Sequence, residues 1–564
     1  MFRIGSFVVV AWMVSISGAI YDEVYRPQLH YSPPKGWLSD PNGLIYGNGI
    51  YHMFYQCQPD DANSISNVHW GHSISTDLIH WKTLDTALYP PNNGFAMFSG
   101  GAIFDHNNIT GLQTNRNTPA LILMPSLFNR KNHRQNVWLA YSNDAPEYTK
   151  FKYYEKNPII PGPPETEIAA FRDQTVFKYQ DYYVSIVVTY NRTQFYHSRN
   201  LLKWELVSEF GEFDGAHTGR WECPSLFEFT VPLGNGKQIK KHVFLITITD
   251  FAQPAHQYFV GTFDGRKFIN DNSKDTVLWV DHGPDCFAEI IYYDLPDGRC
   301  ISINWMGRWE YAENLNFKNW NGQMGLPREL KLIKVGNQFR LTSLPVREIN
   351  SLRINPVRKK NINIMNVYQH EIADSGKKRH LADIEMTMDL KKLKAGDTFD
   401  IVFSGKRDEL KISLKNNVFY LDRSRSGKIV SNYVNPHFSK LGKGNIDNPD
   451  EVLPKMDHSF GGLWEAPRLT NSTNLKLRII IDTNGIEMFA DDGLTSMSAL
   501  FFSEDGIASK MTIQVHSATK KSLIQLKELN VYEMKSIWHN EEGIKKKIEL
   551  SAHTKKLKSK KGGK

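Results

Sequence analysis

The sequence predicts an all-β protein, a five-bladed β-propeller followed by a C-terminal β-sandwich. Long helical periodicities are scarce, and short alternating or apolar runs are separated by turn signals roughly every eight to twelve residues. Between residues 30 and 345 a strand-and-turn phrase recurs at intervals of roughly 55 to 70 residues, which suits four-stranded propeller blades with insertions. At 564 residues the chain is also too long for one ordinary core.

The recurring phrase ends a strand in a small polar residue, makes a turn, and opens the next strand with an aromatic or hydrophobic residue. Its clearest copies are residues 72–81, 197–204, 141–144 and 261–265. Two hairpins are also expected, around Gly47-Asn48-Gly49 and around Gln180-Asp181. Together these features predict about five blades in residues 20–345.

A second domain is predicted downstream, because the pattern changes after Leu341 to clean alternation. Asn484-Gly485 lies at the centre of 478–489 and is the strongest short hairpin signal. We expect a linker at 346–362, a β-sandwich at 363–540 and a basic tail at 541–564.

The N-terminus predicts a secreted, extracellular protein. Arg3 precedes an apolar stretch at 7–16 and the small residues Ser17, Gly18 and Ala19, as in a signal peptide spanning residues 1–19. No later stretch is long enough for a transmembrane helix, so no stable membrane anchor is expected. Sequons at Asn108, Asn191 and Asn471 are candidate glycosylation sites, although chance also produces sequons.

The formal charge of +8 is confined to the end of the chain. Residues 545–564 hold nine Lys and one Glu, which accounts for the whole excess. Such a run is typical of a solvated, disordered tail, and weak adhesion to an acidic polysaccharide or membrane surface is the alternative. No nucleic-acid partner is expected.

Only four cysteines occur, which excludes a disulfide-built scaffold, and their spacing does not resemble a zinc site. Cys286 and Cys300 are spaced to bridge across a hairpin, but sequence leaves the pairing open.

Three acidic motifs stand out in the first half of the chain. Asp40 lies in Trp37-Leu38-Ser39-Asp40-Pro41-Asn42-Gly43, which taken alone is an ordinary turn sequence. Asp173 follows Arg172, and such a pair is usually a surface ion pair. Glu222 stands between Trp221 and Cys223, an apolar setting that favours the neutral carboxyl and suits a general acid, although a glutamate at a strand end is the plain alternative.

In this order, the three motifs resemble the signature of glycoside hydrolase family 32, the invertases, inulinases and levanases. The resemblance covers most of residues 30–535. Further similar blocks are Phe54-Tyr55-Gln56, His69-Trp70-Gly71-His72-Ser73, Phe98-Ser99-Gly100, Asp285-Cys286-Phe287-Ala288, Gly325-Leu326-Pro327-Arg328-Glu329-Leu330 and residues 486–493.

The resemblance implies a propeller with a funnel-shaped site on its axis, and hydrolysis of β-fructofuranosides such as sucrose, inulin or levan. Asp40 would be the nucleophile, Glu222 the general acid and base, and Asp173 the transition-state stabiliser that Arg172 keeps ionised. The first two carboxyls should lie about 5 to 5.5 Å apart, as in retaining glycosidases. The family pattern places Ser39, Asn42, Gln56, Trp70, Phe98 and Ser99 on the fructosyl unit, with no metal or cofactor. Gln56 and Trp70 are alternatively core residues.

Four departures from the family pattern put donor and acceptor preference in doubt. They are Ser39 for the usual Asn, Gln174 for Pro, Ser225 for Asp, and Gly101 for Ser. A fructosyltransferase on the same scaffold is therefore the second hypothesis. A sugar-binding protein that has lost catalysis is the third, and an inverting propeller glycosidase of another family is the fourth. The sequence does not decide the oligomeric state or the preference among sucrose, inulin and levan.

Overall fold

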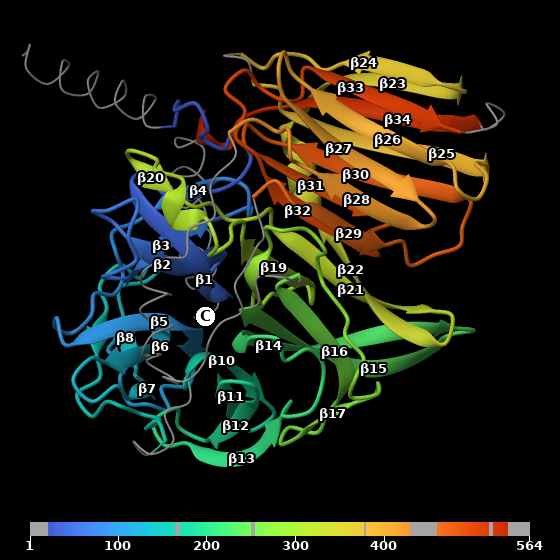
Figure 1. Cartoon of the computed structure of the whole chain (residues 1–564). Coiled ribbons are helices and arrows are strands. Elements are labelled where there is room, and N and C mark those ends of the chain that lie inside the picture. The colour runs from blue at the N-terminus through green and yellow to red at the C-terminus, as the bar shows by residue number, and fades with distance from the viewer. Residues whose placement is uncertain are drawn as a thin grey trace, which may run out of the picture.

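The computed structural model describes residues 21–163, 170–249, 254–376, 379–428, 460–517 and 523–539. The expected signal peptide, residues 1–19, and the expected tail, residues 541–564, lie outside these ranges. Within the described ranges the secondary structure is almost wholly strand, with three short 3-10 helices, so the predicted all-β class is confirmed. Figure 1 shows a ring of sheets beside a layered β-domain.

The predicted five-bladed propeller is confirmed, since five antiparallel sheets follow one another along the chain. In blade one, β20 adds to β1 in parallel. Blade one contains β1 (Gly36–Gly47), β2 (Ile50–Gln58), β3 (His69–Ser75), β4 (Trp81–Thr83) and β20 (Trp320–Asn321), and blade two contains β5 (Phe95–Asp105), β6 (Ala120–Asn129), β7 (Gln135–Val137), β8 (Ala140–Ser142) and β9 (Lys152–Tyr153). Blade three contains β10 (Arg172–Tyr179), β11 (Tyr182–Val188), β12 (Thr193–Ser198) and β13 (Glu205–Phe210), and blade four contains β14 (Arg220–Gly234), β15 (Lys237–Thr249), β16 (His256–Phe263) and β17 (Phe268–Asn270). Blade five contains β18 (Phe287–Ile291), β19 (Cys300–Trp305), β21 (Arg328–Val335) and β22 (Gln338–Pro345).

The recurring sequence phrase forms the same turn in different blades. The Asp77 side chain accepts the backbone N–H groups of the second and third residues after it, and Asn200 does the same in blade three. In both turns a tryptophan indole, Trp81 or Trp204, donates to a backbone carbonyl three residues earlier, at 3.1 Å. The short polar side chain thus satisfies amides that the turn leaves unpaired.

The expected hairpins are confirmed by the strand registers. Their closing pairs are Gly47 with Ile50, Tyr179 with Tyr182, and Ile481 with Ile486.

Two six-stranded antiparallel sheets form the predicted sandwich, and their facing aliphatic side chains make the largest apolar core. One sheet has the order β23 (Arg353–Ile364), β34 (Leu523–Met534), β25 (Ala382–Lys392), β30 (Asn474–Ile481), β31 (Gly485–Ala490), β32 (Thr495–Leu500). The other has the order β24 (Val367–Glu371), β33 (Lys510–His516), β26 (Thr398–Ser404), β27 (Glu409–Lys415), β28 (Val418–Asp422), β29 (Leu463–Pro467). The 3-10 helices are η1 (Ala312–Asn314), η2 (Arg347–Leu352) and η3 (Ile537–His539).

The segment expected to be a linker, 346–362, instead contains η2 and most of β23. β23 pairs with β34 at the edge of its sheet, and residues 355–361 are exposed. An exposed edge strand carries charged residues that discourage pairing with other chains. The polar, basic composition of this strand therefore mimics that of a linker.

A fully buried ionic cluster joins the N-terminal segment, blade five and the sandwich. The His30 ring lies between two carboxylates, with Nδ1 2.7 Å from Asp482 and Nε2 3.0 Å from Glu487. Arg328 contacts Glu487 at 2.7 Å and Asp281 at 2.9 Å. These contacts fix the sandwich against the propeller.

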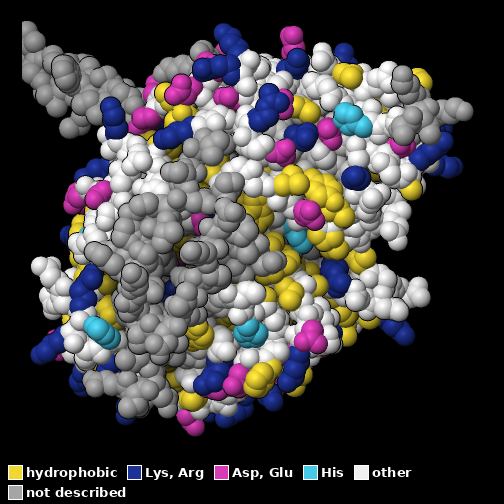
Figure 2. Space-filling model, viewed as in Figure 1, with side chains coloured by type: hydrophobic (Ala, Val, Ile, Leu, Met, Phe, Trp, Pro, Cys, Tyr) yellow, Lys and Arg dark blue, Asp and Glu magenta, His cyan; other side chains and the backbone are white. Residues whose placement is uncertain are grey.

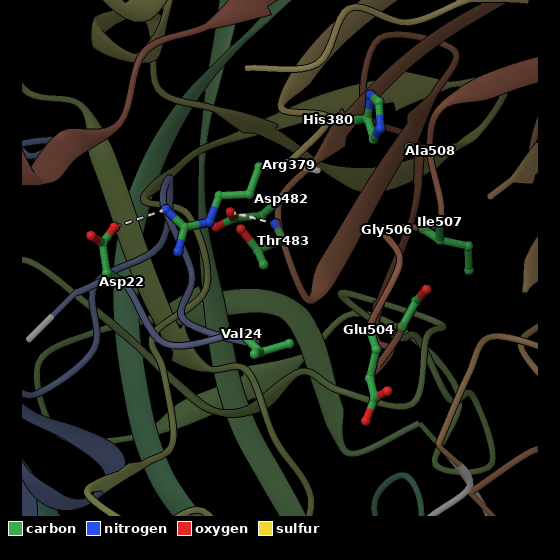
Figure 3. A pocket seen from close by; sticks show the side chains of 11 residues that line it. Asp22, Val24, Arg379, His380, Asp482, Thr483, Glu504, Gly506, Ile507 and Ala508 are labelled. Atoms are coloured by element: carbon green, nitrogen blue, oxygen red, sulfur yellow. Dashed lines mark hydrogen bonds and ion pairs between the residues drawn. The ribbon is translucent and has the colours of Figure 1, made fainter. Parts of the chain in front are cut away.

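The surface beside this junction is hollowed. A pocket of about 330 Å³ lies where the N-terminal segment meets the sandwich, and Arg379 there contacts Asp22 at 3.3 Å (Figure 3). Figure 2 shows hydrophobic side chains gathered along the seam between the sandwich and the propeller.

Candidate active site

The innermost strand of every blade is bulged where it approaches the propeller axis. β1, β5, β10, β14 and β18 each show a register shift against the next strand of their blade. Asp173 and Cys223 lie at such shifts with φ values of +55° and +50°. Bulges bend a strand and redirect a side chain, so the five shifts turn side chains toward the axis. Figure 1 shows β1, β5, β10 and β14 around it.

Asp40, on β1, is buried in this centre. Its Oδ2 accepts a hydrogen bond from Ser99 Oγ at 3.4 Å, and its Oδ1 has no partner among the residues that the structure describes. Burial, followed by the negative charges of Glu222 and Asp173, raises the pKa of Asp40 well above its usual range. Burial and the neighbouring negative charges therefore both favour the protonated form of Asp40.

Ser99 connects three predicted site residues. Gln56 Nε2 donates to Ser99 Oγ at 3.3 Å. With the Asn42 amide turned so that its nitrogen faces Ser99, Asn42 donates to the same oxygen at 3.0 Å and accepts the Gln56 backbone N–H at 3.2 Å. Asn42 and Gln56 therefore support Ser99, which in turn holds Asp40.

Asp173, on β10, is buried beside Arg172 and faces Glu222. Burial is the largest influence and raises the pKa of Asp173 to about 7; Arg172 lowers it and Glu222 raises it. Arg172 thus acts on Asp173 in the expected direction, without keeping the pKa of Asp173 in its usual range. The desolvation of the carboxylate outweighs the attraction of the guanidinium.

Arg172 instead makes its shorter contact with Glu222, on β14. Arg172 Nη2 lies 2.8 Å from Glu222 Oε1, whereas Arg172 Nε lies 3.5 Å from Asp173 Oδ2. The guanidinium also lies over the Phe98 ring, 5.4 Å from its centroid. Arg172 thus bridges two carboxyls of the site and packs on an aromatic face.

The apolar setting expected for Glu222 is only partly present. Trp221 packs into the core between blades three and four, and its indole donates to Ala216. Successive residues of a strand face opposite sides, so a sequence neighbour need not be a spatial neighbour. Cys223, at the bulge, does stay close to the carboxyls, and burial together with Asp173 and Asp40 raises the pKa of its thiol.

The remaining predicted residues lie around this cluster. Ser39 is buried next to Asp40 on β1. Trp70, on β3, is fully buried in a core cluster, and its indole N–H donates to the Phe98 carbonyl at 3.1 Å. The structure therefore places Trp70 behind Phe98, where it positions the strand that carries Ser99.

All four cysteines are buried free thiols, so Cys286 and Cys300 are not bridged. Within the described ranges no group of three or more His, Cys, Asp or Glu side chains is arranged to hold a metal ion.

Comparison with known families decides the identity of the chain. The description "Glycosyl hydrolases family 32 N-terminal domain" matches residues 30–345, and "Glycosyl hydrolases family 32 C terminal" matches residues 348–533. The chain belongs to glycoside hydrolase family 32. In this family-32 chain the matched regions coincide with the propeller and the sandwich.

Individual relatives agree. The levanase of Bacillus subtilis is 33% identical over 531 residues, covering 92% of this family-32 chain and 72% of the levanase. The crystal structure of exo-inulinase from Aspergillus awamori has a TM-score of 0.77 at 28% identity and covers 92% of this chain and 100% of its own. The structure of β-fructofuranosidase from Schwanniomyces occidentalis complexed with fructosyl-erythritol has a TM-score of 0.74 at 26% identity. The match covers 92% of this chain and 99% of the β-fructofuranosidase.

Sequence reasoning missed one residue that contacts Asp173 and one that packs on the sequence motif of Asp40. Ser126 contacts the Asp173 backbone from blade two, and Trp309 is a partly buried ring stacked on Trp37. A lone hydroxyl in the otherwise apolar run 121–128 was the available signal for Ser126. Trp309 had no comparable signal, because a tryptophan in a sequence is as often a core residue as a site residue.

Proposed function

We propose that this glycoside hydrolase removes terminal β-D-fructofuranosyl units with retention of configuration, with sucrose as the first substrate to test and inulin or levan as alternatives. The supporting observation is the cluster of buried Asp40 and Asp173 with partly buried Glu222, on the inner strands of blades one, three and four. In it one oxygen of Asp40 has no partner among the described residues. The names levanase, exo-inulinase and invertase among its relatives agree with this substrate class.

The proposed first step forms a fructosyl-enzyme. The unpartnered Oδ1 of Asp40 attacks the anomeric carbon, and Glu222 gives its proton to the departing glycosidic oxygen. Ser99 donates to the other Asp40 oxygen and orients the carboxylate for attack. In the second step Glu222 takes a proton from water, and the resulting hydroxide displaces Asp40 and releases fructose.

Asp173 and Arg172 act on the charge that develops between these steps. A ketofuranoside has no hydrogen on its anomeric carbon, so its transition state carries strong oxocarbenium character and favours a fixed negative charge nearby. Asp173 supplies that charge and accepts hydrogen bonds from sugar hydroxyls. Arg172 has to loosen its contact with Glu222 when Glu222 holds the proton, and substrate hydroxyls are the new partners.

The product profile from sucrose tests this function. Equal glucose and fructose at low and high sucrose support hydrolysis, whereas excess glucose with fructo-oligosaccharides at high sucrose supports transfer. Release of nothing from sucrose, inulin or levan would leave the catalytically silent binding protein as the better account.

We also propose that the protein is exported and N-glycosylated. Two relatives are named extracellular exo-inulinases, and along the described ranges no helix has the length and apolar character needed to cross a bilayer. Asn108 and Asn471 are exposed on the surface, and Asn191 is half-buried. Expression in the native host should yield culture-medium protein that begins after Ala19 and shifts in mass on deglycosylation.

A further inference from the structure

Asp173 has a backbone conformation that its side chain does not favour. Its φ of +55° lies in the left-handed region, and it falls within the register shift between Arg172 and Thr175 on β10. A non-glycine residue persists there only when surrounding contacts determine the conformation. The contacts that determine it here come from the neighbouring blade.

Ser126, on β6 of blade two, supplies the central contact. Its hydroxyl accepts the Asp173 backbone N–H at 3.0 Å and donates to Gln174 Oε1 at 2.7 Å. Both Ser126 and Gln174 are buried, so neither bond can be replaced by bulk water. The Ser126 hydroxyl therefore hydrogen-bonds both the main chain of Asp173 and the side chain of Gln174.

Gly100, on β5, makes room for this arrangement. A Cβ atom at Gly100 would lie 2.1 Å from the Met124 carbonyl oxygen and 2.9 Å from Gln174 Nε2. The Gln174 amide therefore packs where a side chain on β5 would otherwise stand. Its position on the axis depends on the absence of that side chain.

A small cavity on the propeller axis lies against Gln174. Gln174 Nε2 and Ser225 Oγ are buried without a partner among the described residues, and both side chains line this cavity of about 20 Å³. That volume holds about one water molecule, and the two unpaired polar groups in an otherwise largely apolar lining favour its occupation. A water there would complete the hydrogen bonds of Gln174.

We infer that Ser126 and Gln174, with one ordered water on the propeller axis, are positioning residues that hold Asp173 in its productive conformation. The inference rests on the role proposed above for Asp173. Neither residue touches substrate; each acts through the main chain of Asp173 or through its partner. The charged groups facing Asp173 are Arg172 on its own strand, Glu222 on β14 and Asp40 on β1.

Ser126→Ala tests the inference, with Ser185→Ala as its matched control. Ser185 is a fully buried serine on the second strand of blade three, and its hydroxyl has no partner among the described residues. A shift of about 1 Å in a catalytic group can cost roughly 100-fold in rate, so we expect Ser126→Ala to lose about that much in kcat/KM. Ser185→Ala should stay within about twofold, because it breaks no such contact.

The pH profile separates positioning from a general loss of stability. Displacing Asp173 relative to Arg172 and Glu222 should move the acidic limb of the kcat/KM profile in Ser126→Ala and in Gln174→Met, and Ser126→Thr should restore it. The inference would be overturned if Ser126→Ala and Gln174→Met kept the wild-type rate and pH profile. It would also be overturned if Ser126→Ala and Ser185→Ala lost the same activity and the pH profile did not move.

Crystal structures test the inference independently of activity. In Ser126→Ala we expect Asp173 to leave the left-handed region, and in the wild type we expect density for a water between Gln174 and Ser225. An unchanged Asp173 backbone in the variant would overturn the inference even in an active enzyme. A wild type inactive on every fructoside would instead refute the proposed function, and the two structures would still decide whether Ser126 holds Asp173.

Discussion

Arg172 lies closer to Glu222 than to its own sequence neighbour Asp173, with contacts of 2.8 Å and 3.5 Å respectively. The guanidinium therefore bridges the proposed general acid and Asp173. Catalysis requires the proton on Glu222, so Arg172 has to exchange this contact for substrate when substrate binds. The bridge makes Arg172 the residue through which the two carboxyls affect each other.

Replacing Arg172 with Gln should slow the enzyme and shift its pH dependence. Arg172 lowers the pKa of Asp173, which is about 7 in the presence of the arginine, so removal of the charge raises that pKa further. Because Asp173 acts as an anion, the acidic limb of kcat/KM should move to higher pH by about one unit. Steady-state kinetics across pH measure this, with Arg192→Gln, a partly exposed arginine on a neighbouring turn, as the control. An unmoved acidic limb would contradict the coupling.

The buried His52–His72 pair should make the propeller sensitive to acid. Burial lowers the pKa of His52 to about 3 and that of His72 well below its usual range, and the rings lie 3.1 Å apart, Nδ1 to Nε2. Each ring binds a proton more tightly in the unfolded chain than in the folded protein. The free energy of unfolding is therefore unaffected by these rings above about pH 6.5 and declines as pH falls below it, by up to about 1.4 kcal/mol per pH unit for each ring.

Replacing His72 with Asn removes one of these protonations. The melting temperature of the variant should be lower than that of the wild type at neutral pH but should fall less steeply with acid. Thermal scans from about pH 4 to pH 8 measure both slopes. The exposed His133→Asn should retain the wild-type slope, and equal slopes for His72→Asn and the wild type would refute the assignment.

The ionic cluster at the domain interface should respond to base. Burial disfavours the charged His30 ring, but the hydrogen bonds that the ring donates to Asp482 and Glu487, with the charges of these carboxylates, outweigh it and raise the pKa of His30 to about 9. Because the pKa of His30 is higher in the folded protein than in the unfolded chain, the protonated ring stabilises the fold. This stabilisation is fully present below about pH 6.5 and is lost as pH rises toward 9.

His30→Gln should cost about 3 kcal/mol of unfolding free energy near neutral pH, because it leaves the buried Asp482 without its cation and Glu487 with Arg328 alone. Urea titrations should show the difference from wild type shrinking as pH approaches 9. The exposed His516→Gln should cost far less. A pH-independent difference for His30→Gln would mean that packing, not charge, accounts for the loss.

Local rules explain which features could be predicted from the sequence. Asn484-Gly485 correctly marked a hairpin, although the strands close at Ile481 and Ile486 with four residues between them, not with the two-residue turn that this pair favours. The turns at Asp77 and Asn200 were recognisable because each polar side chain caps amides close to it in sequence. β23 was missed because an edge strand in water needs no apolar alternation.

The site was predicted as a set of residues, but its contacts were not. The Arg172–Glu222 pair joins strands of two blades, and the Ser126 hydroxyl reaches Asp173 from a third. Such contacts depend on bulges that redirect side chains, and sequence spacing alone does not reveal them. The neighbours of Glu222 were misjudged for the same reason, since Trp221 turns away from the axis.

In the proposed mechanism Asp40 forms the covalent fructosyl-enzyme, and the decisive measurement is the sucrose product profile of Asp40→Asn against wild type. The change keeps the shape of the side chain, so folding should be retained, while loss of the nucleophile should lower kcat by about 10⁴-fold. Glu222→Gln and Asp173→Asn should also be impaired, and Asp77→Asn should be active. Glucose and fructose release by a folded Asp40→Asn at near the wild-type rate would contradict the account.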